Sequence, residues 1–335
     1  MQETYGKASA EVIHPGLLLL LGFVLGVLTG FFGVGGGWLL TPALNILGLP
    51  MVYAIGTGFF TLVGKTLYAA MRHHKLGNVD IRLGIIMGIP SCAGVELGKK
   101  LVFHLEKANL AETYVRVVYM VLMLAVSLSM LIEYFRYRKM DRKEQGEGEA
   151  TEKEQSPGFT RYIYPIGLPP RISLSRSGVY SISLWVIIAC GILTGFVSGF
   201  LGIGGGFIAL PLLIYVIGAP TINAVGTSLV VVLITSCYGT CVFGLAGYVQ
   251  WISALIIFAG SLLGVHLGVY ATRYVTGMKI RNLFALMVLA VAVSVFLKQI
   301  NMATVSSYLV MSSACALCLA VLIPLGENLL QRTTS

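Results

Sequence analysis

The sequence predicts an all-α polytopic membrane protein made of two inverted repeats. Each repeat is expected to hold a glycine-broken re-entrant helical element and three or more transmembrane helices. Of the 335 residues, 56% are hydrophobic and only 11% are charged. Several uninterrupted apolar stretches exceed the roughly 18 residues that a membrane-spanning helix needs. A glycine-rich stretch also occurs twice, which indicates an internal duplication.

The duplicated stretch is GFFGVGGGWLLTPAL at residues 30–44, which returns at an offset of 169 as GFLGIGGGFIALPLL at residues 199–213. Eight of the fifteen aligned positions are identical. Inside a helix, glycine costs about 1 kcal/mol and proline about 3 kcal/mol relative to alanine. Because each copy nevertheless lies in a long apolar run, each is expected to break a helix at membrane depth.

The first half is expected to begin with a helix at residues 15–32, in which Gly22, Gly26 and Gly30 form a smooth stripe. Such a stripe lets helix backbones approach closely in lipid. The run at 38–49 is about 18 Å long if helical, too short for a core of about 30 Å, and is predicted to be re-entrant. Further helices are expected at residues 51–71, 83–104 and 114–134.

The second half repeats this plan, and its Gly226-Thr227 pair matches Gly56-Thr57 at an offset of 170. Its helices are expected at residues 181–199, 207–217, 222–245, 252–274, 280–297 and 305–325, of which the last has no partner in the first half. The predicted organisation is a first repeat (1–135), a charged linker (136–177), a second repeat (178–298) and a terminal helix with a tail (299–335). The linker is expected to be solvated and poorly ordered.

The net charge of +9 does not indicate nucleic-acid binding, because nine of the 23 basic residues lie in the linker at 136–176. Most of the others lie in short loops, as in membrane proteins. The positive-inside rule predicts a cell-membrane protein with a cytoplasmic linker and C-terminus. It places residues 72–82 inside and 99–112 outside, and it favours an even number of crossings at each glycine element. The repeats would then be inverted.

The glycine turns are the predicted substrate site. Successive N–H groups in glycine-rich turns form anion-binding nests, and a following helix adds its positive dipole end. Two turns that enter from opposite faces would enclose one anion. The candidate residues are Gly33, Gly35, Gly36, Gly37, Gly202, Gly204, Gly205 and Gly206. The alternative is that these glycines only permit tight packing. A nucleotide P-loop is disfavoured because neither copy is followed by Lys-Ser/Thr.

Lys65 lies in the middle of a predicted helix, and a charge inside the membrane is a functional hypothesis by default. It is expected to supply charge to the anion, with snorkelling or a structural pair with Glu96 as the alternative. The hydroxyls of Thr57, Thr227 and Ser228 follow glycines or lie next to them and are expected to complete the anion shell.

Two titratable residues occupy matching positions, Glu96 in GVELG and His266 in GVHLG. Both are candidates for proton coupling, His266 because histidine titrates near neutral pH. The alternative is a helix-end carboxylate and a hydrogen-bonded histidine. His73 and His74 adjoin basic residues and are expected on a solvated face rather than in a metal site.

No Asp or Glu occurs between Ser177 and Gly326. The second half therefore lacks material for paired-carboxylate catalysis, a carboxylate metal cage or an acidic cation pathway. The six cysteines lie in apolar segments and are expected to be small buried hydrophobes. The sequence thus predicts a non-enzyme without catalytic residues, metal or cofactor, whose substrate is an anion.

The doubled G-F-x-G-x-G-G-G motif, each copy followed by a proline and then a Gly-Thr pair, resembles the sulfite exporter TauE/SafE family of membrane permeases. The resemblance covers about residues 15–297. It implies transport of a small sulfur-containing anion such as sulfite, thiosulfate or an organosulfonate. A passive anion channel and a non-transporting membrane scaffold or sensor remain alternatives. The anion, the direction of transport, the coupling ion and homodimer formation are left open.

Overall fold

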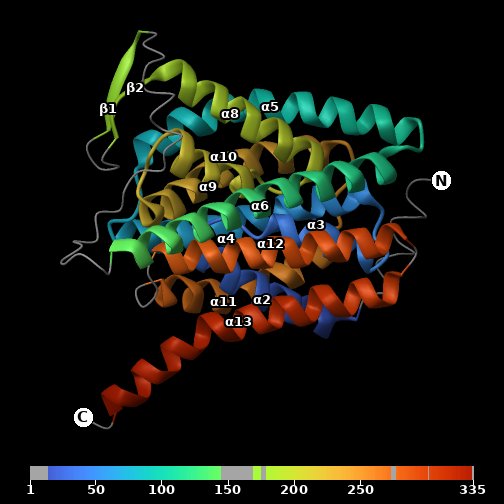
Figure 1. Cartoon of the computed structure of the whole chain (residues 1–335). Helices are drawn as coiled ribbons and strands as arrows, with labels where there is room; N and C mark the ends of the chain where they lie inside the picture. Colours follow the sequence, from blue (N-terminus) through green and yellow to red (C-terminus); the bar gives the residue numbers. More distant parts are fainter. Residues whose placement is uncertain (1–13, 145–168, 175–178, 273–276, 301, 334–335) are drawn as a thin grey trace.

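The computed structural model describes residues 14–144, 169–174, 179–272, 277–300 and 302–333 (Figure 1). The first half of the chain contains α2 (Pro15–Phe32), α3 (Gly37–Ile46), α4 (Met51–Lys75), α5 (Ile81–Lys107) and α6 (Ala111–Glu144). The second half contains α8 (Leu184–Leu201), α9 (Gly206–Pro211), the π-helical turn η2 (Leu212–Val216), α10 (Thr221–Leu245), α11 (Trp251–Ala271), α12 (Gly277–Gln299) and α13 (Ala303–Thr333). The helices run roughly side by side in one bundle (Figure 1).

Within the described residues, seven helices are long and apolar enough to cross a membrane, namely α2, α5, α6, α8, α10, α11 and α13. The prediction of a polytopic α-helical membrane protein is confirmed. Helix α4 is not among the seven, because Lys65 and a basic last turn lower its hydropathy. Large apolar side chains such as Leu263 and Ile89 are exposed on the outside of the bundle, where lipid would contact them.

The glycine stripes bring two pairs of helices into very close contact. Helix α2 packs against α11, and α8 packs against α5. A β-carbon on any stripe glycine would overlap the partner's backbone carbonyl. The contacts are Gly22 with Ile257, Gly26 with Ser261 and Gly30 with Val265, and likewise Gly191 with Met87, Gly195 with Ser91 and Gly199 with Val95. The predicted role of the stripe is confirmed, and residue numbers rise together along each pair, so the paired helices are parallel.

These contacts are reciprocal between the two halves, since each contact of one half reappears in the other with the partners exchanged. Helices α4 and α10, which are the matching helices of the two halves, contact each other and run antiparallel. Phe59 of α4 meets Gly239 of α10, and Ala69 of α4 lies in one buried cluster with Leu229 of α10. As residue numbers rise along α4, they fall along α10.

Both helices break at the predicted glycines. Helix α2 ends at Gly33 with φ +70°, and Gly36 with φ +71° precedes α3. In the second half, Gly202 and Gly205 have φ +72° and +83°. This left-handed backbone costs other L-residues about 1–2 kcal/mol. The conformation of the turns therefore explains why glycine occupies these four positions.

The two glycine turns are buried and pack against each other. A β-carbon on Gly37 would lie 2.7 Å from the carbonyl oxygen of Ile203, and one on Gly206 would overlap the carbonyl of Val34. The side chains of Leu62 and Val232, from the middle of α4 and α10, lie against both turns. The two breaks therefore meet at the centre of the bundle.

The structure adds two features to the expected fold. Strands β1 (Arg171–Leu174) and β2 (Val179–Ser183) form an antiparallel pair near the end of the linker, with Ile172 opposite Ile182. Helix α6 continues to Glu144, ten residues beyond its expected end at 134, because the Lys, Arg and Glu of that segment are good helix formers. The rest of the predicted disordered linker, residues 145–168 and 175–178, lies outside the described residues.

Candidate functional site

The side chain of Lys65 is fully buried at the centre of the bundle. Its Nζ atom has no hydrogen-bond partner in the part of the chain that the structure describes. The amino group lies beside the first glycine turn, since a β-carbon on Gly36 would be 3.5 Å from Nζ and 2.7 Å from Oγ1 of Thr29. The alternative pair with Glu96 does not form, because that carboxylate bonds Lys99 at 2.7 Å.

The backbone of the first turn offers further donors. Among the described residues, the N–H groups of Gly35 and Gly36 have no backbone or side-chain acceptor. They lie at the start of α3, a ten-residue helix whose N-terminus carries the positive end of its dipole. When Lys65 is protonated, its amino group and these amides lie at one place and would together attract an anion.

The second turn is surrounded by hydroxyl groups. The side-chain oxygens of Thr194, Ser198 and Ser236 are buried and have no hydrogen-bond partner among the described residues. A β-carbon on Gly205 would lie 2.7 Å from Cγ2 of Thr194 and 3.7 Å from Cβ of Ser198, and one on Gly204 would lie 3.4 Å from Oγ of Ser236. Buried hydroxyls are normally paired, so these three side chains have hydrogen-bonding capacity that the described residues do not use.

The sequence analysis missed these three hydroxyl residues. A signal for two of them was present in the repeat. Ser198 matches Thr29 at the offset of 169, and Ser236 matches Thr66 at the offset of 170. A hydroxyl kept at matching positions of two apolar helices marks a place where both copies need a polar side chain.

Hydroxyls also hold the carbonyl groups of the turns. Ser228 donates to the carbonyl oxygen of Gly33 at 2.7 Å, and Thr41 donates to that of Gly202 at 3.0 Å. Thr235 donates to the carbonyl oxygen of Gly204 at 2.8 Å. The structure thus brings Ser228 to the first turn, where its hydroxyl fixes the turn's conformation. A contact of Ser228 with substrate stays a prediction.

Thr57 and Thr227 make a pair of reciprocal contacts with loops of the opposite half. The Oγ1 atom of Thr57 accepts a hydrogen bond from the backbone N–H of Gln250, and that of Thr227 accepts one from Asp80, both at 3.0 Å. Each bond therefore ties the second turn of α4 or α10 to the residue that precedes α11 or α5. Substrate binding by these two residues is not needed to explain where they lie, and it too stays a prediction.

Replacing Thr227 with valine is expected to lower the free energy of unfolding by about 1–3 kcal/mol, because the buried N–H of Asp80 loses its acceptor. Loss of this acceptor alone should leave anion transport per folded molecule unchanged. Thermal melting of purified protein and uptake by proteoliposomes would measure the two effects. Thr272→Val is the matched control, since among the described residues the hydroxyl of Thr272 donates only to the carbonyl oxygen of Val269, near the end of α11. Normal melting with lost transport would instead place Thr227 in the substrate shell.

The two candidates for proton coupling each contact a tyrosine from the other half. Tyr238 donates to Oε2 of Glu96 at 3.0 Å, and the hydroxyl of Tyr68 lies 3.1 Å from Nδ1 of His266. Arg72 donates to the oxygen of Tyr68, so the tyrosine hydrogen is available for the histidine. The side chain of His266 is exposed on the bundle surface. None of these contacts places Glu96 or His266 at the glycine turns.

Two side expectations need correction. His73 is not on a solvated face, because it is buried and its Nε2 lies 2.8 Å from the carbonyl oxygen of Gly30, where α2 ends. Cys237 and Cys241 are exposed rather than buried. Among the described residues, no group of three or more His, Cys, Asp or Glu residues could hold a metal ion.

Comparison with known proteins shows which family this chain resembles. A model of the family described as "Sulfite exporter TauE/SafE" matches residues 18–295, which include both glycine turns and the helices around them. The chain belongs to the TauE/SafE family. It is therefore a multi-pass membrane transporter.

Individual relatives are named as probable membrane transporter proteins. The chain is 30% identical over 280 residues to a probable membrane transporter protein of Xylella fastidiosa, which covers 82% of this chain and 91% of the relative. It is 26% identical over 266 residues to the probable membrane transporter protein YunE of Bacillus subtilis, with 77% and 88% covered. A similar relative occurs in the archaeon Methanocaldococcus jannaschii, with 26% identity over 230 residues and 67% and 70% covered. No solved structure gives a significant match.

Proposed function

We propose that this TauE/SafE protein is a secondary transporter of a small sulfur-containing anion, such as sulfite, thiosulfate or an organosulfonate. The observation that carries the proposal is the buried amino group of Lys65, which has no acceptor among the described residues and lies beside Gly36. An isolated charge at membrane depth is expensive, so its retention calls for a partner of opposite sign. A bound anion would be that partner.

The proposed anion lies between the two glycine turns. On one side it would accept hydrogen bonds from Lys65 and from the N–H groups of Gly35 and Gly36. On the other side it would meet the hydroxyls of Thr194, Ser198 and Ser236. A sulfur oxyanion suits this set because it presents several acceptor oxygens and no donor when ionised. The absence of acidic residues from the second repeat favours the same sign of substrate.

Alternating access at this site would require two repeats that lie inverted in the membrane, and several contacts support that arrangement. Helices α4 and α10 are antiparallel, and the contacts of the two halves are reciprocal. Helix α3 runs back along α4, since Gly37 lies near Leu62 and Gly58 lies near Thr41. This direction of α3 supports the proposed re-entrant element, in which the chain would enter along α2 and return along α3. Inverted repeats with broken helices at the midplane are common in secondary transporters.

The orientation follows from the basic residues. The β1–β2 hairpin that ends the linker and the end of α13 lie at the same end of the bundle, opposite the end where α2 begins (Figure 1). The positive-inside rule assigns the linker end to the cytoplasm. Protonation of His266 or Glu96 is the proposed coupling step. It would act through the tyrosine pairs that join each residue to the other half of the molecule.

Counterflow in proteoliposomes tests this function. Vesicles loaded with unlabelled sulfite should accumulate labelled external sulfite transiently, and thiosulfate and ethanesulfonate should be compared as internal anions. A carrier exchanges anion for anion, so accumulation should vanish when the vesicles are empty. Conductive flux without stimulation by internal anion would identify a channel. Absence of flux for all three anions in correctly inserted protein would leave the scaffold or sensor as the remaining reading.

A further inference from the structure

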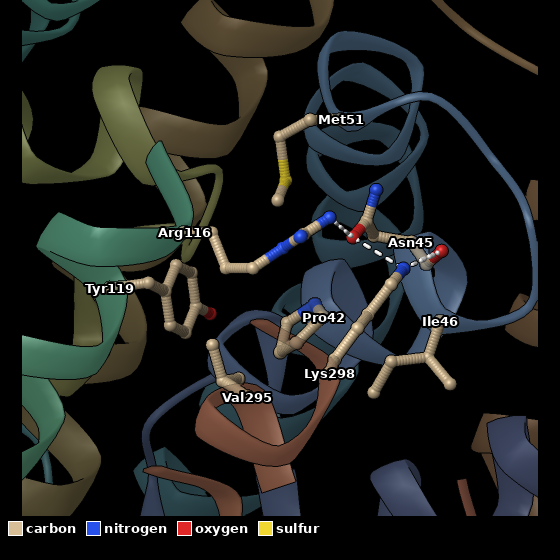
Figure 2. A pocket seen from close by; sticks show the side chains of 8 residues that line it. All are labelled: Pro42, Asn45, Ile46, Met51, Arg116, Tyr119, Val295 and Lys298. Carbon is tan, nitrogen blue, oxygen red and sulfur yellow. Dashed lines mark hydrogen bonds between the residues drawn. The ribbon is translucent and has the colours of Figure 1, made fainter. Parts of the chain in front are cut away.

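The end of α3 is joined to two other helices by a network of polar side chains. Asn45 lies near the C-terminus of α3, and Figure 2 shows Arg116 of α6 and Lys298 of α12 approaching it from different helices. Lys298 donates to the backbone oxygen of Asn45 at 2.5 Å and to its Oδ1 at 2.8 Å. The network therefore lies at the end of the bundle where α6 begins and α12 ends.

Asn45 is the centre of this network, and both ends of its side-chain amide are bonded. Its Nδ2 donates to Oε1 of Glu112 at 3.2 Å and to the carbonyl oxygen of Leu49 at 3.1 Å. Arg116 donates to Oδ1 of Asn45 at 3.4 Å and to Oε1 of Glu112 at 2.6 Å. The amide of Asn45 is thus satisfied within the protein, so the network connects helices and needs no ligand.

The bond from Lys298 joins the two repeats. Asn45 and Arg116 belong to the first repeat, whereas Lys298 lies in the last turn of α12, 253 residues from Asn45. Helix α6 of the first repeat also holds the start of α3, since Tyr119 donates to the carbonyl oxygen of Trp38 at 2.6 Å. Lys298 is therefore the link in this network between the end of α3 and the second repeat.

The second repeat carries no equivalent of this amide. The residue of its short element that matches Asn45 at the offset of 169 is Ile214, in the π-helical turn η2. The side chain of isoleucine neither donates nor accepts a hydrogen bond. A requirement shared by both short elements therefore does not explain the network, which is specific to the end of α3.

The space beside the network is closed. Arg116, Lys298 and the apolar side chains of Ile46, Met51 and Val295 border a space with room for about one water molecule. A sulfur oxyanion is larger than water and could not pass between these side chains. This end of the bundle is therefore shut in the present conformation.

Helix α3 lies between the first glycine turn and this end of the bundle. It begins at Gly37, directly after the turn, and ends at Ile46, one residue beyond Asn45. In alternating access, a site at the glycine turns opens to this end in one state and is closed to it in the other. Opening here would move the end of α3 away from α12 and break the bonds from Lys298.

We propose that Asn45, Arg116 and Lys298 form a lock that keeps this end of the transporter closed, and that the bonds from Lys298 break when it opens. This inference rests on the proposed function, because it assumes alternating access at the glycine turns. The lock stabilises the closed state of one end only, since the matching short element has Ile214 in place of Asn45. The two ends therefore differ in how easily they open.

The test measures how often this end opens, through the reactivity of a buried cysteine. Val295 borders the closed space and is 4% exposed, so Val295→Cys is the reporter. The six native cysteines are replaced by alanine, and the full chain in nanodiscs reacts with sulfonatoethyl methanethiosulfonate. Adding Lys298→Met should raise the reaction rate roughly tenfold, which corresponds to about 1.4 kcal/mol of closed-state stabilisation, the order of one buried hydrogen bond.

Three controls separate opening from loss of fold. Lys298→Arg keeps a cation that can bond Asn45 and should retain the slow rate. Lys100→Met removes an exposed lysine of α5 outside the network and should leave the rate unchanged. A second reporter, Ala209→Cys, is buried in α9 and should stay unreactive when Lys298→Met is added, because only one end opens.

Three outcomes would overturn the proposal. An unchanged rate at Val295→Cys after Lys298→Met would mean that the network does not hold this end closed. An equal rise at Val295→Cys and Ala209→Cys would mean general loosening of the bundle. Equal rates in Lys298→Arg and Lys298→Met would contradict the role of the bond to Asn45. The labelling needs no added anion and no flux, so a wild-type protein without counterflow would reject the proposed function through a separate measurement.

Discussion

Lys65→Met is expected to make the protein more resistant to thermal unfolding and at the same time to abolish anion counterflow. Replacing a buried ion pair by apolar residues of similar volume is often neutral or stabilising by about 1–4 kcal/mol, and an unpaired buried charge has no pairing energy to lose. Lys65 is fully buried and has no acceptor among the described residues, so its replacement leaves no partner behind. Loss of one partner of a buried charge pair costs about 2–5 kcal/mol of binding, which corresponds to an affinity at least about 30-fold lower.

Higher thermal stability together with loss of transport distinguishes a substrate-binding lysine from a structural one. A lysine that only supports the fold would destabilise the protein when removed and would leave the affinity of the remaining folded molecules unchanged. Lys75→Met is the control, because Lys75 is exposed at the end of the same helix. Melting curves with and without sulfite should show that sulfite stabilises the wild-type protein and the Lys75→Met variant, but not Lys65→Met.

Gly36→Ala and Gly205→Ala are expected to abolish counterflow while the protein still inserts and remains monodisperse. Both glycines have positive φ, which strains any other L-residue by about 1–2 kcal/mol. The added methyl group would also sit in the proposed site, 2.7 Å from Oγ1 of Thr29 at the first turn and 2.7 Å from Cγ2 of Thr194 at the second.

Gly77→Ala separates backbone strain from occupation of the site. Gly77 has φ +78°, yet no atom lies within 4 Å of the position that its β-carbon would take. This variant should show a similar loss of stability and normal counterflow per folded molecule. Undiminished sulfite transport by Gly36→Ala and Gly205→Ala would rule out a central site between the turns. Equal loss of transport in Gly77→Ala would attribute the effect to strain alone.

The helices could be predicted because each depends on the hydropathy and helix propensity of consecutive residues. The first helix was expected at residues 15–32 and is observed at Pro15–Phe32. The break after it follows from the glycines and from the cost that glycine and proline impose on a helix. The end of α6 was misplaced because the hydropathy signal stops at about residue 134, whereas the helix continues through residues that are polar but favour helix.

The candidate site was predictable only in part. Glycine turns and a mid-helix lysine can be recognised one segment at a time, and the structure brings Gly36 and Lys65 together. The sequence of one segment does not show which hydrogen-bond partner a hydroxyl group meets in the folded protein. Thr57 and Ser198 look alike in the sequence, yet the first accepts a bond from the backbone of Gln250 and the second has no partner among the described residues.

The sequence by itself determined that this is a duplicated membrane protein, where its helices break, and that the second repeat carries no acidic residue. These properties follow from composition, repeat and local helix propensity. Only the tertiary structure decided that the two turns meet, which hydroxyls surround them, and that Arg116 and Lys298 converge on Asn45. The physical reason is that such placements depend on the packing of helices far apart in the chain, which no local pattern encodes.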